Sequence, residues 1–407
     1  MDLFEKCRGF YSSPEVAQKY GYPTNPMTAI KMGIYPYFIP IEHAEGTEIF
    51  IDGKRLLMIG SNNYLGLTNH PHVKEASIKA IEKYGTSCTG SRFLNGTLQM
   101  HIDLEHRLAK LIGQEAALVF STGFQTNLGS ISAIMDQNDI IIADKEVHAS
   151  IVDGIRMSKV LKKTHLRLFK HNDTDDLEAI LKACPDNVGR LVIVDGVFSM
   201  AGDIAPLDRI APLAKKYGAR LMVDDAHAIG VLGGGRGTAH HFGHPEWPDL
   251  VMGTFSKSFA SLGGVIAGPK EAIHWIQLFA RPFMFSASLP PANVAAVLAC
   301  LDVLEKEPER VTRVNQIGER VRRELKGIGY DVGPSQTPII PIVIGDEMKT
   351  VMAWKTLYEA GIYTNVALPP AVPPNYSLLR TSYMASHTDE QVDRILETFK
   401  QVKSLID

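Results

Sequence analysis

Short apolar runs alternate with amphipathic stretches between about residues 70 and 270. The runs are AALVF (116–120), DIIIA (139–143), RLVIVDG (190–196), ARLMVDD (219–225), DLVMGTF (249–255) and GGVIAG (263–268). They are rich in Val, Ile and Leu on both faces, which is typical of buried strands. Between them, HIDLEHRLAKLIG and LDRIAPLAKKYG repeat apolar residues at helical spacing and end in Gly. This alternation predicts a mostly parallel sheet covered by helices.

The two ends of the chain have a different pattern. TEIFIDGKRLLMI alternates apolar and polar residues around Asp52-Gly53, which predicts a hairpin. After residue 289 we expect a long amphipathic helix broken near Pro308, short strands in TPIIPIVIG, a helix in KTVMAWKTLYEAG, a Pro-rich loop and a final charged helix. The prediction is an α/β protein with an N-terminal arm and hairpin (1–58), a large domain (59–289) and a smaller α+β C-terminal domain (290–407).

Composition and charge exclude several broad classes. The 407 residues are 45% hydrophobic and 21% charged, with 42 basic and 45 acidic side chains and a net charge of -3. A nucleic-acid-binding protein would show a basic surplus, and a disordered chain would be poorer in apolar residues. No apolar run approaches the roughly 18 residues that a membrane span needs. We therefore expect neither nucleic acid as a partner nor an integral membrane segment.

The N-terminus and the cysteines favour a cytoplasmic enzyme. MDLFEKCRGFYSS mixes charged and aromatic residues and has no apolar core of a secretory signal. The cysteines lie far apart, without a CxxC pair, which fits a reduced compartment; they are Cys7, Cys88, Cys184 and Cys300.

Lys257 is the sharpest chemical candidate. It follows a predicted strand in GTFSKSFASLGG (253–264), among the hydroxyls of Thr254, Ser256 and Ser258. A lysine in an interior loop loses solvation, which lowers its pKa and makes it an amine nucleophile, while the hydroxyls could donate to a phosphate. The alternative is a surface loop with a solvated lysine.

Three other predicted strands also end in polar residues. Asp224 ends the strand in LMVDDAHAIGVLG, and His227 follows three residues later. A buried acid there needs a cationic or protonated partner, although it could instead cap a helix. In FSTGFQTN, the turn at Gly123 precedes a candidate helix and could bind an anion or be only a cap. His148 follows the predicted strand DIIIA. It could bind a ligand at the strand end, or it could be a helix cap or a surface residue.

Two histidine-rich or basic stretches have simpler interpretations. His240, His241 and His244 lack the glutamate of HExxH, and nothing supplies further ligands, so we expect no metal site. The basic stretch KVLKKTHLRLFKH (159–171) is interpreted as a solvated helix and strand edge, with contact to a phosphorylated substrate or an anionic membrane surface as the alternative.

The four strand-end features together match the needs of one cofactor. Because strand ends meet at one rim of a parallel sheet, we expect an anion-binding turn, a histidine, a buried acid and a lysine to converge there. Pyridoxal 5'-phosphate (PLP) requires a phosphate cradle, a ring stacker, a partner for the pyridinium nitrogen and a Schiff-base lysine. The sequence therefore predicts a PLP site.

A series of motifs carries a resemblance to a known family. In order they are SNNYLGL (61–67), GTSCTGSRFLNGT (85–97), STGFQTN, DKEVHASIVDG, DGVFSMAGD (195–203), VDDAHAIGVLG, GTFSKSFASLGG and FSASLPP (285–291). From about residue 33 to 400 the chain resembles the α-oxoamine synthases. These are fold-type I (aspartate aminotransferase-like) PLP enzymes that join an amino acid to an acyl-CoA and release carbon dioxide. The resemblance implies a homodimer with shared active sites.

Flanking segments narrow the resemblance. GIYPYFIPIE, SRFLNGTL, RPFMFSASLPP and NVALPPAVPPNYSLLRTS are similar to the bacterial branch that condenses L-serine with palmitoyl-CoA. That reaction gives 3-ketodihydrosphingosine, CoA and CO2 and begins sphingolipid synthesis. Members that use glycine or alanine with a shorter acyl-CoA share the core motifs and remain the alternative. A non-catalytic partner subunit would lack Lys257, and a nicotinamide dehydrogenase would need GxGxxG in the first strand–helix unit.

The resemblance implies a role for each matched position around the cofactor. Lys257 would bind PLP as a Schiff base and then act as the base on the Cα proton. Asp224 would pair with the pyridine nitrogen, His227 would bond the phenolic oxygen, and His148 would stack on the ring and orient the substrate carboxylate. The other implied cofactor contacts are Gly123, Phe124, Ser199, Thr254, Ser256 and Ser286 of the partner subunit.

Asn62 and Arg380 are implied to grip the carboxylate of the amino acid, a task that suits the planar fork of arginine. One position departs from the pattern. Some bacterial members of the serine-using branch have an arginine twelve residues before the carboxylate arginine, where this chain has Leu368. If that arginine assists binding, Arg380 must act alone here or recruit another group.

Overall fold

The structure, a computed structural model, describes residues 2–20, 22 and 25–406 and divides into two compact units. The first unit comprises 1–62, 200–202 and 314–407, and the second comprises 63–199 and 203–313. The three predicted segments do not coincide with these units. The N-terminal arm belongs to the same unit as the C-terminal segment, and α13 (Pro291–Lys306) packs against α4 (Pro71–Tyr84) and α5 (Gln99–Ile112) in the second unit.

A seven-stranded sheet forms the centre of the second unit, in the order β4-β10-β9-β8-β7-β5-β6. β10 runs antiparallel to both of its neighbours and the remaining pairs are parallel, so the predicted mostly parallel sheet is confirmed. Its strands are β4 Ala116–Phe120, β5 Ile140–Asp144, β6 His165–Phe169, β7 Arg190–Asp195, β8 Arg220–Asp224, β9 Leu250–Thr254 and β10 Gly264–Gly268.

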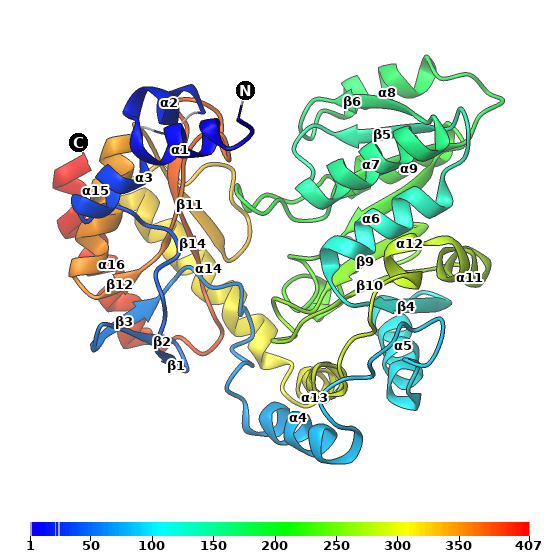
Figure 1. The fold of residues 1–407 in the computed structure, drawn as a ribbon, viewed down its shortest axis with the longest axis horizontal. Helices are drawn as coiled ribbons and strands as arrows, with labels where there is room; N and C mark the ends of the chain where they lie inside the picture. The colour runs from blue at the N-terminus through cyan, green and yellow to red at the C-terminus, as the bar shows by residue number, and fades with distance from the viewer. Residues whose placement is uncertain (1, 21, 23–24, 407) are drawn as a thin grey trace. The chain divides into compact units, whose positions relative to one another are not determined.

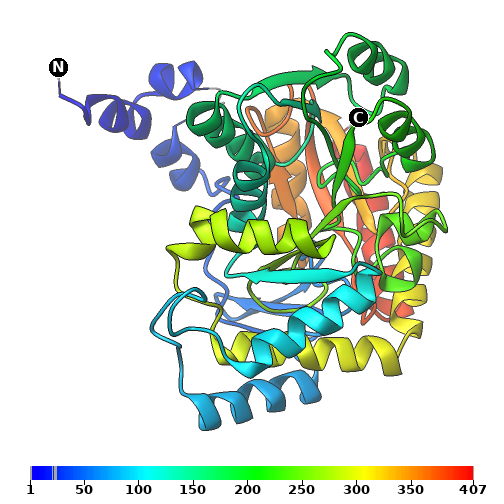
Figure 2. The same cartoon turned by 90° about the vertical axis from the view of Figure 1, so that its right-hand side faces the viewer.

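Helices cover both faces of this sheet (Figure 1). Alternate residues of β7 show why: Leu191 and Ile193 pack in one apolar cluster, and Val192 and Val194 pack in another. Figures 1 and 2 show α4 and α13 lying side by side. Besides α4, α5 and α13, the helices are α6 Gly123–Ile134, α7 Ala149–Lys162, α8 Thr174–Lys182, α9 Leu207–Lys216, the short 3-10 helix η1 Gly233–Gly235, α10 Thr238–His241, α11 Lys270–Phe279 and α12 Arg281–Met284.

The predicted basic stretch 159–171 consists of the end of α7 and the edge strand β6, as the sequence indicated. Lys163 adopts a left-handed conformation and ends the helix, and Val160, Leu161 and Leu168 are exposed. Among the helices that the structure describes, none combines the length and the apolar character needed to cross a bilayer.

The first unit contains two smaller sheets, in the orders β1-β2-β3-β12 and β11-β14-β13. The predicted hairpin is confirmed as β2–β3, with Asp52 and Gly53 both at positive φ, as a tight two-residue turn requires. The predicted break near Pro308 separates α13 from α14 Glu309–Ile328, which crosses into this unit. The predicted short strands at 337–345 form one strand, β11.

The elements of the first unit are α1 Glu5–Ser12, α2 Pro14–Lys19, α3 Pro26–Lys31, β1 His43–Glu45, β2 Glu48–Ile51, β3 Lys54–Met58, β11 Ile339–Gly345, α15 Glu347–Glu359, β12 Ile362–Tyr363, β13 Asn365–Ala367, β14 Ser377–Ser382 and α16 Asp389–Ile406, together with most of α14. Its apolar core lies between the sheet β11-β14-β13 and the helices α14, α15 and α16. Leu368, the position at which the chain departs from the family resemblance, is buried in this core.

Candidate active site

A cavity of about 270 Å³ opens at the carboxyl ends of β7, β8 and β9 in the second unit. This is the edge at which open α/β sheets bind ligands. The cavity brings together eight of the residues singled out from the sequence, which are Gly123, Phe124, His148, Asp224, His227, Thr254, Ser256 and Lys257.

One wall of the cavity is a cradle at the beginning of α6. Thr122 caps the helix by accepting a hydrogen bond from the amide of Gln125 at 3.1 Å. A Cβ added to Gly123 would lie 2.6 Å from Thr254 Oγ1, and that hydroxyl is 3.1 Å from Ser256 Oγ. Glycine therefore keeps room beside the hydroxyls, and helix amides with two hydroxyls are the donor set that a phosphate requires.

Asp224 places a buried carboxylate on the cavity wall. Its side chain is 4% exposed, and it accepts hydrogen bonds from Asn127 Nδ2 at 2.7 Å and from the amide of Ala226 at 3.0 Å. Asn127 also donates to Ser150 Oγ at 2.9 Å. Sequence reasoning missed Asn127, although it lies four residues after Gly123 in STGFQTN and hence on the same face of α6.

His148 lies at the beginning of α7 with its ring in the cavity. Its Nδ1 is 2.7 Å from Ser150 Oγ, and its amide donates to Asp195 Oδ1 at 3.3 Å. Burial lowers the pKa of His148, and the charge of Lys257 acts in the same direction while Asp224 opposes it. Burial therefore favours the uncharged form of the imidazole that faces the cavity. Burial and the nearby Asp224 raise the pKa of Asp195 well above its ordinary value.

His227 is held by a partner that the sequence analysis did not single out. Its Nδ1 is 2.7 Å from the hydroxyl of Tyr64, and the two rings meet edge-on. Tyr64 is fully buried, so it fixes the plane of the His227 ring. The residue belongs to SNNYLGL, a segment distant in the sequence, and only the motif itself could have identified it.

Lys257 lines the cavity from the loop after β9 and is half-buried. Phe255 and Phe259 on either side of it are buried in the apolar core, and the Lys257 carbonyl accepts a hydrogen bond from the amide of Ala260. The short loop is therefore anchored at both ends, and this holds the lysine main chain at the rim of the cavity.

The remaining predicted site residues do not line this cavity. Ser199 is half-buried after β7, and Ser286 Oγ accepts a hydrogen bond from Gln125 Nε2 at 3.1 Å. Asn62 and Arg380 belong to the first unit, where Arg380 Nη2 donates to Asn62 Oδ1 at 3.0 Å. Arg380 is 6% exposed on β14.

The three clustered histidines have separate partners. His240 Nε2 is 2.8 Å from the carbonyl of Ile112, His244 Nδ1 is 2.9 Å from Glu246 Oε1, and the His241 ring packs edge-on against Phe242. Among the described residues, no group of three or more His, Cys, Asp or Glu side chains is arranged so that it could hold a metal ion.

Comparisons with known proteins identify the family. The family model for aminotransferase class I and II matches residues 54–399. A serine palmitoyltransferase of Bacteriovorax stolpii is 51% identical over 92% of this chain and 89% of its own length. An 8-amino-7-oxononanoate synthase of Thermoanaerobacter pseudethanolicus is 42% identical over 91% of this chain and 94% of its own length.

A solved serine palmitoyltransferase from S. paucimobilis, with a bound PLP-myriocin aldimine, superposes with a TM-score of 0.92. It is 34% identical, and the match covers 100% of this chain and 99% of that one. Fold and cavity together define a PLP-dependent enzyme of fold type I. The chain belongs to the aminotransferase class I and II family and, within it, to the α-oxoamine synthases, which are acyltransferases that use PLP.

The cavity fits this cofactor on its own evidence. The cradle at Gly123 offers donors for a phosphate, the buried Asp224 offers an acceptor for a protonated ring nitrogen, and Lys257 offers an amine for the aldehyde.

Proposed function

We propose that this enzyme condenses L-serine with a long-chain acyl-CoA, palmitoyl-CoA, to give 3-ketodihydrosphingosine, CoA and CO2. The similarity to the serine palmitoyltransferase of Bacteriovorax stolpii, 51% over nearly the whole of both chains, carries the proposal. The 42% identity to an 8-amino-7-oxononanoate synthase supports a second candidate, in which the same site uses another amino acid with a shorter acyl-CoA.

In the proposed reaction, PLP supplies an electron sink for the carbanion formed at the Cα atom of the amino acid. Lys257 Nζ binds the cofactor and then takes and returns the Cα proton. The Asp224 carboxylate keeps a proton on the ring nitrogen, because a buried acid stabilises a protonated neighbour. Asn127 orients that carboxylate, and its 2.7 Å hydrogen bond is the contact on which we base this role.

The other residues that line the cavity are proposed to bind and orient the cofactor. The amides at Gly123 and the hydroxyls of Thr254 and Ser256 bind the phosphate, while Phe124 contacts the cofactor. The imidazole of His148, whose uncharged form burial favours, would stack on the cofactor ring. His227, which Tyr64 holds in place, would hydrogen-bond the phenolic oxygen of the cofactor.

Asn62 and Arg380 are proposed to bind the carboxylate of serine, and Arg380 does so without an arginine at position 368. We further propose a homodimer in which Ser286 of the partner subunit completes the phosphate site. Ser199 of the same chain is proposed to contact the cofactor. Dimer formation is measurable by light scattering of the purified holoenzyme.

The choice of amino acid is tested by the visible absorbance of the holoenzyme. L-serine, glycine and L-alanine are added separately, and the visible absorbance band of the cofactor is followed. We expect serine to change the band at the lowest concentration, followed by CoA release when palmitoyl-CoA is added. A response to glycine or alanine alone would agree with the family assignment but contradict serine as the substrate. Leu368 would then be the first position to replace.

The phosphate cradle is tested by Gly123→Ala. The added Cβ would lie 2.6 Å from Thr254 Oγ1 and 2.9 Å from Thr254 Cβ, so the helix or the hydroxyl must shift. Overpacking of this kind costs about 1–3 kcal/mol, and we expect the Kd for PLP to rise about 10- to 100-fold. Gly327→Ala is the matched control because its Cβ would meet nothing within 4 Å. Equal PLP affinity in the two variants would contradict the assignment.

A further inference from the structure

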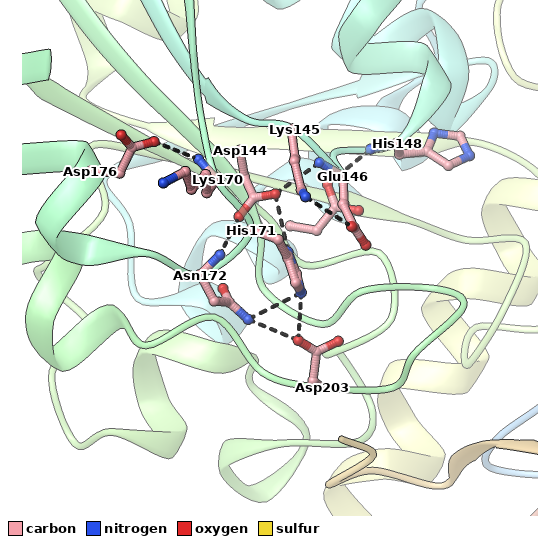
Figure 3. Close-up of polar contacts among 10 residues, drawn as sticks. Asp144, Lys145, Glu146, His148, Lys170, His171, Asn172, Asp176 and Asp203 are labelled. Carbon is pink, nitrogen blue, oxygen red and sulfur yellow. Dashed lines mark hydrogen bonds and ion pairs between the residues drawn. The ribbon is translucent and has the colours of Figure 1, made fainter. Parts of the chain in front are cut away.

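His171 joins two buried carboxylates outside the cavity (Figure 3). Its Nδ1 is 3.1 Å from Asp144 Oδ1, and its Nε2 is 2.8 Å from Asp203 Oδ2. Asp144 is 0% and Asp203 5% exposed. The rings of His171 and Phe198 pack edge-on, with their centroids 4.4 Å apart. Sequence analysis gave His171 no role beyond its place at the end of the basic stretch.

The geometry requires a charged imidazole. Each ring nitrogen faces a carboxylate oxygen, so both nitrogens donate, which only the protonated ring can do. Burial opposes this charge, but the hydrogen bonds and negative charges of Asp144 and Asp203 outweigh burial and raise the pKa of His171 to about 10. His171 therefore carries a positive charge throughout the neutral pH range and balances one of the two carboxylates.

Asp144 connects His171 to the turn that ends at His148. Asp144 ends β5, and its carboxylate accepts hydrogen bonds from the amides of Glu146 and Asn172, both at 2.8 Å. The amide of Lys145 donates to the carbonyl of Phe169 at 3.0 Å. The turn from β5 into α7 is thus fixed to the segment after β6, and His148 is the residue at which that turn ends.

Asp203 connects His171 to a second loop. Its side chain also accepts a hydrogen bond from Asn172 Nδ2 at 2.8 Å, and its carbonyl accepts one from the amide of Phe198 at 3.0 Å. Phe198 precedes Ser199 and packs on the His171 ring. The loop after β7 is therefore held by the same imidazole that holds the turn before α7.

We propose that His171 is a positioning residue for the reaction, an imidazolium that holds the turn ending at His148 against the loop after β7 that contains Ser199. It does not line the cavity, so it acts through the residues that it holds. The inference rests on the proposed role of His148 and is independent of which amino acid is the substrate.

The test compares His171→Gln with His165→Gln in the holoenzyme. His165 is an exposed histidine on β6, six residues earlier, and serves as the matched control. Amide hydrogen exchange is followed by mass spectrometry, and circular dichroism of the cofactor band is recorded without substrate. For His171→Gln we expect faster exchange in 144–152 and 196–204 and a changed cofactor band, whereas His165→Gln stays at wild-type values.

Turnover separates positioning from simple stability. A misplacement of about 1 Å can reduce a rate 100-fold, so we expect His171→Gln to lower kcat about 10- to 100-fold per folded holoenzyme. Imidazole added to His171→Ala is expected to restore part of the lost kcat. If His171→Gln folds poorly, Asp203→Asn provides the second variant, with a smaller change in the same segments.

Two results would overturn the proposal. One is amide hydrogen exchange in 144–152 and 196–204 that stays at wild-type rates in His171→Gln. If that variant fails to fold, the same result in Asp203→Asn decides. The other is a lowered melting temperature with wild-type kcat and an unchanged cofactor band, which would assign His171 to stability alone. Because exchange and dichroism need no substrate, a failed serine assay would leave these two measurements valid, and kcat would then be measured with the amino acid that the enzyme does use.

The stability contributed by His171 has a predicted pH dependence. The ionisable groups that face its ring are Asp144 and Asp203, and they raise the pKa of His171 from 6.5 to about 10. The folded state therefore holds the proton more tightly, and this stabilisation is complete below pH 6.5 and is lost as the pH rises toward 10. The difference in melting temperature between wild type and His171→Gln should shrink between pH 7 and 10. A difference that stays constant over this range would contradict the charged imidazole.

Discussion

The Lys257→Ala variant is expected to bind PLP without covalent attachment and to lose nearly all turnover. Proton transfer by a positioned side chain contributes about 10²- to 10⁴-fold to a rate, and among the described residues that line the cavity there is no second lysine. The phosphate cradle at Gly123 and the Asp224 carboxylate are unaffected by the substitution, so the cofactor should remain bound. We expect kcat to fall by at least that factor.

Two measurements separate these effects in Lys257→Ala. Borohydride reduction followed by mass spectrometry should show covalent cofactor on the wild type and none on the variant, while dialysis and absorbance report the cofactor that remains bound. Lys215→Ala, at an exposed position on α9, is the control and should match the wild type. Near-normal product formation by Lys257→Ala would remove this lysine from the mechanism.

The Asp224→Asn variant should lose about 10²- to 10³-fold in kcat while still binding the cofactor. An amide cannot balance a protonated ring nitrogen, and loss of one partner of a buried ion pair costs about 3–5 kcal/mol. A pH titration of the cofactor absorbance should show that the ring nitrogen of the variant loses its proton at lower pH. The amide oxygen of the variant could still accept the Asn127 hydrogen bond at 2.7 Å, but its NH2 group would then face the amide of Ala226, so one hydrogen bond is lost together with the charge.

Asp225→Asn is the matched control for Asp224→Asn, because the two residues are adjacent and both are buried. Asp225 accepts hydrogen bonds from the amide and hydroxyl of Thr238 and does not line the cavity. Burial raises the pKa of Asp225 to about 6, and its substitution should therefore change the stability of the fold. Because Asp225 does not line the cavity, the cofactor spectrum should stay unchanged. Equal losses of kcat in both variants would show that burial, and not contact with the cofactor, explains the effect.

The residues predicted from the sequence at strand ends lie together in the cavity. Asp224 and Thr254 directly end β8 and β9, and Lys257 follows β9 within three residues. Strand position alone is enough to bring such residues to one edge of a parallel sheet. The six strands predicted between residues 116 and 268 are also present. Each was recognisable in the sequence as a short apolar run, because the sheet is covered on both faces.

The residues that the sequence did not reveal are partners from distant segments. Tyr64 reaches His227 across 163 residues, and Asn127 reaches Asp224 across 97. His171 pairs with Asp144 and Asp203, which lie 27 and 32 residues away. No periodicity encodes such pairings, since they depend on which distant segments the fold brings together. The same holds for Leu368, whose burial follows from packing in the core of the first unit.

The most direct test of the proposed function is a competition assay. The holoenzyme is incubated with palmitoyl-CoA and equal concentrations of L-serine, glycine and L-alanine, and the lipid products are identified by mass spectrometry. The account predicts 3-ketodihydrosphingosine as the main product, formed together with one CoA per molecule. A product built from glycine or alanine, or no release of CoA from palmitoyl-CoA, would contradict it.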